Sequence, residues 1–268
     1  MNGRIIVTGA TGSMGAAAVE ALAGKGHAVL MACRNRDKAK AVRDDILTRI
    51  PEADIVIRQL DLASMASVQL FVDGLGDEPV AALFNNAGVI SKSYFITLDG
   101  FENTFSVNYF GPWLLTKLLL PKLPADARIV NMVSLTCRYA SLDETKLVSE
   151  ERDFHQLRTY ALAKRALLSF SLELARRYPS LCVNLADPGI VASNMIDLGH
   201  WYDKLADVLF KPLCKKPEAG VRPALCALEA TAGPRYYVGK GSREIPARYL
   251  DPNLDKRIWE ATERLIAV

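Results

Sequence analysis

The chain has 268 residues, half of them hydrophobic, which suits one compact α/β domain with a single large core. Its formal net charge is only +3, and no basic stripe interleaved with aromatic residues is present, so nucleic acid is a poor candidate partner. The longest apolar stretch, residues 113–123, contains two lysines and a proline, and is too short to span a bilayer. We therefore predict no transmembrane segment.

Cysteine usage and the first residues indicate a cytoplasmic protein. The five cysteines are widely spaced and form no C-x-x-C pair, as expected of a reduced protein. The sequence passes from "MNGR" directly into a strand-like run, which leaves no room for a signal peptide. No His, Cys, Asp or Glu pattern predicts a metal site.

In chain order, short β-branched apolar runs alternate with longer segments of helical period. The predicted strands are 4–8, 28–32, 54–59, 80–85, 127–133, 181–186 and 235–239, and the predicted helices are 14–25, 36–49, 64–74, 99–122, 158–178, 217–230 and 254–266. Strands that are apolar on both faces, alternating with helices, predict a doubly wound parallel sheet in a single domain. Two long connections, 134–157 and 188–216, leave carboxyl ends of strands, where we expect the substrate to bind.

The segment "TGATGSMG", residues 8–15, joins the first strand to the first helix. Gly9 permits a tight turn, Gly12 lets the backbone approach a pyrophosphate, and Gly15 lets the helix lie close to the sheet. The start of the helix would then offer free N–H groups to phosphates. We interpret this segment as a dinucleotide-binding turn, with an ordinary glycine-rich turn as the alternative.

The end of the second strand indicates which dinucleotide binds. An acidic residue that would hold the ribose 2′-hydroxyl of NAD is absent there, and Cys33 and Arg34 occupy the place. The planar guanidinium of Arg34 suits a 2′-phosphate, and Arg36 and Lys38 add positive potential. We therefore predict NADP(H), the alternative being a solvated basic helix start.

Tyr160 and Lys164 are four residues apart and share one face of a predicted helix. The ammonium of Lys164, together with a cationic nicotinamide, should favour the phenolate and lower the pKa of Tyr160. Tyr160 is thus a candidate proton donor to a carbonyl that is being reduced. Ser134 ends a strand and would hydrogen-bond the reacting oxygen. A tyrosine lying on the helix surface is the alternative.

Four further segments carry a family resemblance: "LFNNAG" (83–88), "VNMVSLT" (130–136), "YALAK" (160–164) and "ADPGIV" (186–191). With the glycine turn, their order and spacing resemble the short-chain dehydrogenase/reductase family over essentially the whole chain. The resemblance implies a Rossmann fold and an oxidoreductase. The long segment between Ser134 and Tyr160, "ACRN" and "RIWEATERL" are similar to the retinol-dehydrogenase/protochlorophyllide-reductase-like branch. Ser13 departs from the glycine common in single-domain members, and the spacing resembles that of extended epimerases.

The resemblance also implies further roles. Lys164 binds the nicotinamide ribose, Asn108 supports a proton relay to Lys164 through water, and Asp61 with Leu62 contacts the adenine. The predicted cofactor-contacting residues are Thr8, Gly9, Gly12, Ser13, Met14, Gly15, Arg34, Asn35, Asp61, Leu62, Asn86, Ala87, Gly88, Tyr160, Lys164, Pro188, Gly189, Val191 and Ser193. Asn108 as an ordinary polar helix residue, and Asp61 as a helix N-terminal acid, remain the alternatives.

Apolar residues suggest the substrate and the assembly. Trp201, Leu205, Val208 and Leu209 recur at near-helical intervals, as in a lid over a hydrophobic substrate or a stripe packed on the core. We predict a lipophilic ketone, aldehyde or secondary alcohol, retinoid-, steroid- or lipid-like. The apolar helices 99–122 and 158–178 would face outward in a lone domain and often form a dimer interface in the family, which favours a homodimer. An NADP(H) sensor without turnover and an extended-type epimerase or reductase are the alternative functions.

Overall fold

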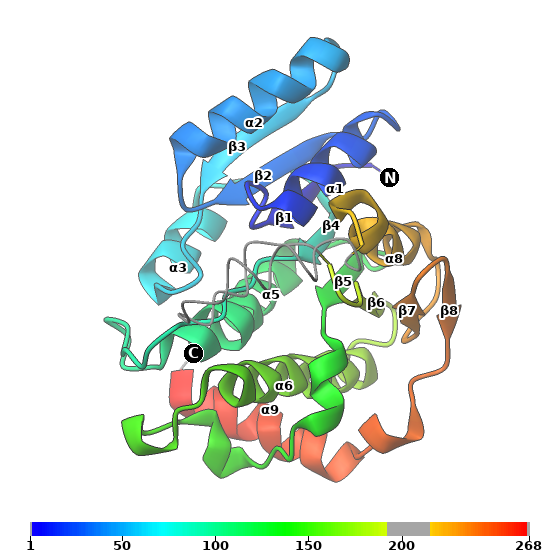
Figure 1. The fold of residues 1–268 in the computed structure, drawn as a ribbon. Coiled ribbons are helices and arrows are strands. Elements are labelled where there is room, and N and C mark those ends of the chain that lie inside the picture. The colour runs from blue at the N-terminus through cyan, green and yellow to red at the C-terminus, as the bar shows by residue number, and fades with distance from the viewer. Residues whose placement is uncertain (1, 192–214, 267–268) are drawn as a thin grey trace.

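In a computed structural model, which describes residues 2–191 and 215–266, these residues form an eight-stranded sheet of order β3-β2-β1-β4-β5-β6-β7-β8 (Figure 1). All neighbouring strands are parallel except β7 and β8. The strands are β1 (Arg4–Thr8), β2 (Val29–Cys33), β3 (Ile55–Gln59), β4 (Val80–Asn85), β5 (Arg128–Met132), β6 (Cys182–Asp187), β7 (Tyr236–Val238) and β8 (Gly241–Arg243). The predicted doubly wound sheet is confirmed.

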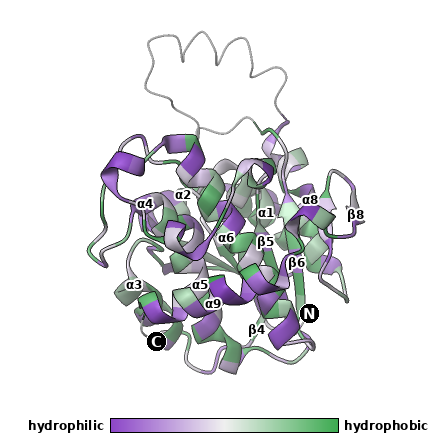
Figure 2. Cartoon of the chain, turned by 90° about the horizontal axis from the view of Figure 1, so that it is seen from below, coloured by the Kyte–Doolittle hydropathy of each residue, from purple (hydrophilic) through white to green (hydrophobic). Residues whose placement is uncertain are grey.

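Helices cover both faces of the sheet. One layer holds α1 (Ser13–Ala23), α2 (Arg36–Arg49) and α8 (Pro217–Glu229), and the other holds α3 (Met65–Asp73), α5 (Gly111–Leu119) and α6 (Gln156–Arg177). Because side chains alternate along a strand, Ile5 and Val7 of β1 pack toward the first layer and Ile6 toward the second. Hydrophobic colour is concentrated in the interior strands in Figure 2.

The prediction of a single helix over 99–122 is wrong in two respects, the residue at which the helix starts and its continuity. Gly100 adopts a left-handed φ of 83°, and the Thr97 N–H donates to the Phe101 carbonyl at 2.8 Å, so a tight turn occupies the expected first turn. The helical region begins with α4 (Asn103–Phe105), passes through a π-helical turn at Ser106–Phe110, and continues as α5.

The two long connections are described to different extents. The first contains three short 3₁₀ turns, Leu135–Tyr139, Glu144–Leu147 and Glu151–Asp153. Most of the second, including the four residues expected to form a lid and Ser193, lies outside the described residues. Within the described ranges, no helix has both the length and the apolarity needed to cross a membrane.

Helix α9 (Pro252–Ile266) packs along α6 on the side away from the sheet (Figure 1). Every residue of α6 from 159 to 174 is buried, and α9 covers the side of the helix that faces away from the sheet. Trp259 of α9 stacks on Phe170 of α6 with ring centroids 5.4 Å apart, and meets Trp113 of α5 edge-on at 6.1 Å. The prediction that the helices 99–122 and 158–178 face outward is therefore wrong. The homodimer was predicted from that exposed face, and this basis for it is lost.

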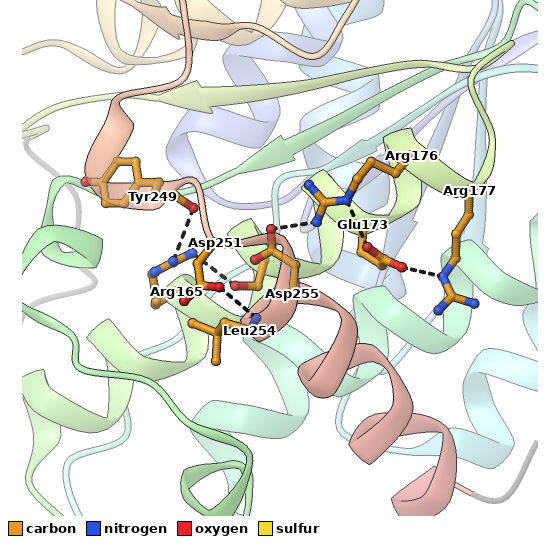
Figure 3. A network of polar contacts seen from close by, with 9 residues as sticks. Arg165, Glu173, Arg176, Arg177, Tyr249, Asp251, Leu254 and Asp255 are labelled. Atoms are coloured by element: carbon orange, nitrogen blue, oxygen red, sulfur yellow. Dashed lines mark hydrogen bonds and ion pairs between the residues drawn. The ribbon is translucent and has the colours of Figure 1, made fainter.

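A network of polar contacts joins α6 and α9 (Figure 3). The fully buried Asp255 of α9 accepts a hydrogen bond from Arg176 of α6 at 2.7 Å. Glu173 accepts from Arg176 at 2.9 Å and from Arg177 at 2.7 Å. Because a buried carboxylate needs partners of this kind, the network fixes where α9 lies along α6.

Candidate active site

The glycine turn between β1 and α1 is sterically tight at two of its glycines. Gly9 has a φ of 63°, and a Cβ there would lie 2.8 Å from the Ala87 Cα atom. A Cβ on Gly15 would lie 2.2 Å from the Gly9 carbonyl oxygen. Gly12 has more room, but it is the N-cap of α1 and supplies no side-chain acceptor. The first N–H groups of α1 are thus left for another acceptor, which suits an anion.

A cavity of about 760 Å³ lies at the carboxyl ends of the strands, where the strand order reverses between β1 and β4. It joins the glycine turn to the "YALAK" segment. The predicted residues that line it are Gly9, Gly12, Ser13, Met14, Gly15, Arg34, Asn35, Asp61, Leu62, Asn86, Ala87, Gly88, Tyr160, Lys164 and Pro188. Sequence reasoning missed several apolar lining residues, including Val89, Ile90 and Val107.

One end of the cavity is basic. Arg34 follows β2 and is exposed, and Lys38 lines the same end. The Asn35 side chain accepts from the Lys38 N–H at 2.8 Å and caps α2. Asp61 lines the wall nearby, and its carboxylate accepts from the Ala63 N–H at 2.9 Å. Positive side chains thus line the cavity just after the end of β2.

Thr8 lies behind the cavity wall and is fully buried. Its hydroxyl accepts hydrogen bonds from the N–H groups of Asn86 and Ala87, both at 3.0 Å. The Asn86 amide nitrogen donates to the Thr8 carbonyl at 2.8 Å. Thr8 therefore fixes the loop after β4 against the glycine turn.

Asn108 lies within the π-helical turn and faces this same loop. Its amide nitrogen donates to the Val89 carbonyl at 2.7 Å, and its oxygen accepts from the Val89 N–H at 3.3 Å. A Cβ on Gly88 would lie 2.8 Å from the Asn108 oxygen and 3.5 Å from the Lys164 nitrogen. The missing side chain of Gly88 leaves space between these two polar groups.

Tyr160 and Lys164 come from the start of α6, and Ser134 follows β5. The Ser134 hydroxyl is hydrogen-bonded to the Tyr160 side chain, and the Lys164 nitrogen lies 5.8 Å from the Tyr160 ring centroid. Burial raises the pKa of Tyr160, and the hydrogen bond from Ser134 offsets this only in part. In the chain by itself the pKa of Tyr160 is therefore raised, because desolvation dominates. The predicted lowering, which requires a cationic nicotinamide beside the ammonium, stays a prediction for the complex with the cofactor.

The charged form of Lys164 is unfavourable in the folded chain. It is almost completely buried, its nitrogen donates to the Met132 carbonyl at 2.9 Å, and burial lowers its pKa to about 8. The charged form therefore reduces the free energy of unfolding below pH 8, and this cost fades as the pH rises toward the unfolded value of 10.5.

Replacing Lys164 with methionine should consequently stabilise the folded chain. We expect Lys164→Met to raise the free energy of unfolding at pH 7 by about 1–3 kcal/mol, from roughly 1.4 kcal/mol per pKa unit less the lost hydrogen bond. Urea unfolding without cofactor measures this, and the gain should shrink at about pH 9.5. The exposed Lys40→Met is the control. A variant less stable than the wild type at pH 7 would contradict the expectation.

The loop after β6 carries the remaining predicted residues. Pro188 lines the cavity, whereas Gly189 and Val191 follow it along the loop. The Asp187 carboxylate accepts from the Gly189 N–H at 2.8 Å and from the Tyr236 hydroxyl at 2.7 Å. Sequence reasoning missed Asp187 and Tyr236. An aspartate directly before Pro-Gly at a strand end is a turn signal that could have identified Asp187, but nothing local identifies Tyr236.

The described cysteines are free thiols. Cys137 is buried close to Tyr160, and burial raises its pKa to about 11, as is typical of a packed thiol rather than a nucleophile. In the described ranges, no group of three or more His, Cys, Asp or Glu residues is arranged to hold a metal ion.

Comparison with known proteins decides the family. The model of the short chain dehydrogenase family matches residues 4–199. Retinol dehydrogenase 13 of Homo sapiens is 32% identical over 98% of this chain and 84% of its own length. Dehydrogenase/reductase SDR family member 13 of Bos taurus is 34% identical over 97% of this chain and 72% of its own length. The chain belongs to the short-chain dehydrogenase/reductase family.

Within this family the chain lies on the retinol dehydrogenase branch. Solved structures agree on the fold. A protein from Mycobacterium paratuberculosis superposes with a TM-score of 0.80 at 26% identity, covering 100% of this chain and 94% of its own. A short-chain dehydrogenase from Sphingobium yanoikuyae in complex with NADPH superposes with a TM-score of 0.67 at 20% identity, covering 87% of each chain.

The family makes the chain an oxidoreductase whose fold binds a nicotinamide cofactor and which acts on a small molecule. The geometry fits such a cofactor. The α1 N-terminus has no side-chain cap, and a side chain at Gly9, Gly15 or Gly88 would collide with the wall of the cradle. These features leave room and hydrogen-bond donors for a pyrophosphate and a nicotinamide ribose.

Proposed function

We propose that this protein is an NADP(H)-dependent oxidoreductase that interconverts a lipophilic ketone or aldehyde and the corresponding alcohol. One observation carries the proposal. Tyr160 and Lys164 line the same cavity as the glycine turn, and Ser134 is hydrogen-bonded to Tyr160. A protein that only sensed the cofactor would have no need for this arrangement of a proton donor, a polar orienting group and a buried cation.

In the proposed reaction, Tyr160 and Ser134 act on the carbonyl oxygen that is being reduced, and Lys164 acts on Tyr160 and on the ribose of the cofactor. The Tyr160 hydroxyl donates a proton to the carbonyl oxygen, and the Ser134 hydroxyl hydrogen-bonds the same oxygen as negative charge develops. When bound, the nicotinamide supplies or accepts the hydride. Lys164 binds the adjoining ribose and assists loss and return of the Tyr160 proton, since its charge favours the phenolate. Asn108, next to Lys164 across Gly88, holds water that resupplies the proton.

The preference for NADP(H) rests on the basic end of the cavity. Arg34 and Lys38 line this end of the cavity beside Asn35, whose side-chain oxygen accepts from the Lys38 N–H, and we infer that the two cations bind the 2′-phosphate of the adenosine ribose. A guanidinium can bind a phosphate through two parallel hydrogen bonds, whereas a ribose hydroxyl offers it much less.

Titration of the protein with NADPH and with NADH, followed by fluorescence, tests this preference. Arg34→Ala should weaken NADPH binding about 10- to 100-fold, as expected for loss of a charge-assisted hydrogen bond, and should change NADH binding by less than about threefold. Lys40→Ala, which removes an exposed cation from the same helix α2 outside the cavity lining, is the matched control. Equal weakening of both cofactors would show that Arg34 does not bind the 2′-phosphate.

The lipophilic character of the substrate is supported by apolar side chains beside the site. Leu135, Tyr139 and Val148 of the connection after β5 are exposed, as is Ile190 of the loop after β6. Both segments start at the carboxyl ends of neighbouring strands, next to Ser134 and Pro188. Such side chains gain free energy when a hydrocarbon substrate covers them. We infer that these two connections are the substrate loops.

A further inference from the structure

Asp187 and Tyr236 form a buried pair next to the candidate active site. Asp187 is 2% exposed at the end of β6, and Tyr236 is 1% exposed on the adjacent β7. The tyrosine hydroxyl donates to one carboxylate oxygen at 2.7 Å, and the Gly189 N–H donates to the other at 2.8 Å. Both oxygens of this carboxylate therefore have a partner, one of them in the loop that follows β6.

That loop is held from two sides. Gly189 adopts a left-handed φ of 72°, which a side chain rarely permits. A second set of contacts comes from Lys215: its ammonium donates to the Pro188 carbonyl at 3.2 Å, and its N–H donates to the Ile190 carbonyl at 3.0 Å. Of these contacts, the bond to Asp187 alone depends on a side chain buried in the fold.

We propose that Asp187 and Tyr236 are a positioning pair, which holds residues 188–191 in the shape that contacts the nicotinamide end of the cofactor and places a negative charge behind Tyr160. This rests on the proposed function, because the cofactor and the role of Tyr160 belong to it. Without the pair, the loop would be more mobile before binding, and the cofactor would have to order it at a cost in affinity.

The effect of the Asp187 charge on Tyr160 depends on which groups lie around the carboxylate. The Val133 N–H donates to the Ala186 carbonyl at 2.9 Å, so Asp187 lies beside the end of β5, next to Ser134 and its partner Tyr160. The other titratable groups that interact with the charge of Asp187 are Tyr236, Tyr249 and Cys137. The Lys215 ammonium donates to the adjoining Pro188 carbonyl, Arg243 lies 5.0 Å from the Tyr236 ring centroid, and Lys164 and Arg165 of α6 act on Cys137. Burial is the main cause of the raised pKa of Tyr160, and the charge of Asp187 raises it further. Removing that charge should therefore lower the pKa of Tyr160.

The first test measures the loop without cofactor. Hydrogen exchange of the Gly189 amide should become at least about tenfold faster in Tyr236→Phe, since Asp187 loses its second partner. Tyr237→Phe removes one hydroxyl from the next residue of the same strand, which packs in the core on the opposite face of the sheet, and should leave this exchange unchanged. Equal acceleration in both variants would reduce the effect to general destabilisation and overturn the proposal.

The second test measures the cofactor and the proton. Asp187→Asn keeps an oxygen for the Gly189 N–H but removes the charge. NADPH affinity, measured by fluorescence, should therefore fall about tenfold in Tyr236→Phe and in Asp187→Ala. In Asp187→Asn it should stay close to that of the wild type. The alkaline limb of carbonyl reduction, where Tyr160 loses its proton, should lie at lower pH in Asp187→Asn than in the wild type.

The outcomes separate the two proposals. Unchanged Gly189 exchange in Tyr236→Phe, or an alkaline limb in Asp187→Asn that does not move, overturns the positioning pair while the enzyme still turns over. Failure of the wild type to bind NADPH refutes the proposed function, and with it the role of the pair toward the cofactor, even if Gly189 exchange responds as expected.

Discussion

Replacing Tyr160 with phenylalanine should reduce turnover by about 10²- to 10⁴-fold, the usual contribution of a positioned proton donor. NADPH affinity should change by less than about threefold, because the aromatic ring that fills the cavity wall remains. The hydroxyl oxygen is the one heavy atom removed, and Ser134 keeps its place through the hydrogen bond that its oxygen accepts from the Thr136 hydroxyl at 3.0 Å. Steady-state reduction of a lipophilic carbonyl by NADPH, together with fluorescence titration, measures both quantities.

Tyr178→Phe is the matched control for this experiment. Tyr178 ends the same helix α6 outside the cavity lining, and loss of its hydroxyl should leave turnover within about twofold of the wild type. Turnover of Tyr160→Phe close to that of the wild type would refute the proposed mechanism. A parallel loss of NADPH affinity would instead show that the tyrosine serves binding.

Replacing Trp259 with alanine should lower the free energy of unfolding by about 3–5 kcal/mol, the range measured when large aromatic residues are removed from a core. Trp259 is 1% exposed and touches Phe170 and Trp113. The charged ends of Lys117 and Arg177 lie 4.8 Å and 4.6 Å from its ring centroid. The substitution therefore removes both packing and cation–π contacts between α9 and its neighbours.

Leu265→Ala, also on α9 but 36% exposed, is the control and should cost less than about 2 kcal/mol. Urea unfolding measures both variants. An effect of Trp259→Ala no larger than that of the control would mean that α9 is not part of the cooperative core.

The sheet was predictable because its strands carry a local signal. The runs at residues 4–8 and 80–85 are apolar on both faces, and each sits between turn residues and a helical segment. Strand β8 was missed because its three residues are all exposed and have no apolar pattern. The first turn of the 99–122 helix was misassigned because the left-handed conformation at Gly100 forms a tight turn there. That turn delays the start of the helix to Asn103.

The candidate site was predictable where its residues are neighbours along the chain. The glycine turn and the Tyr160–Lys164 spacing each lie on one element, and the structure brings both to one cavity. Contacts between distant segments had no such signal. Tyr236 meets Asp187 across 49 positions, and Trp259 meets Trp113 only because α9 packs along α6. The pKa of Tyr160 also depends on burial, which sequence spacing does not report.

The packing of α9 has a consequence for biosynthesis. Residues 156–177 leave the ribosome well before residues 252–266, and until then the outer face of α6, with Phe170 on it, has no cover. A nascent chain with a complete parallel sheet would thus display an aromatic surface to chaperones and to other nascent chains. Substitutions in α9 that leave the finished enzyme active can therefore still lower its yield in the cell, since they prolong the interval in which that surface is exposed.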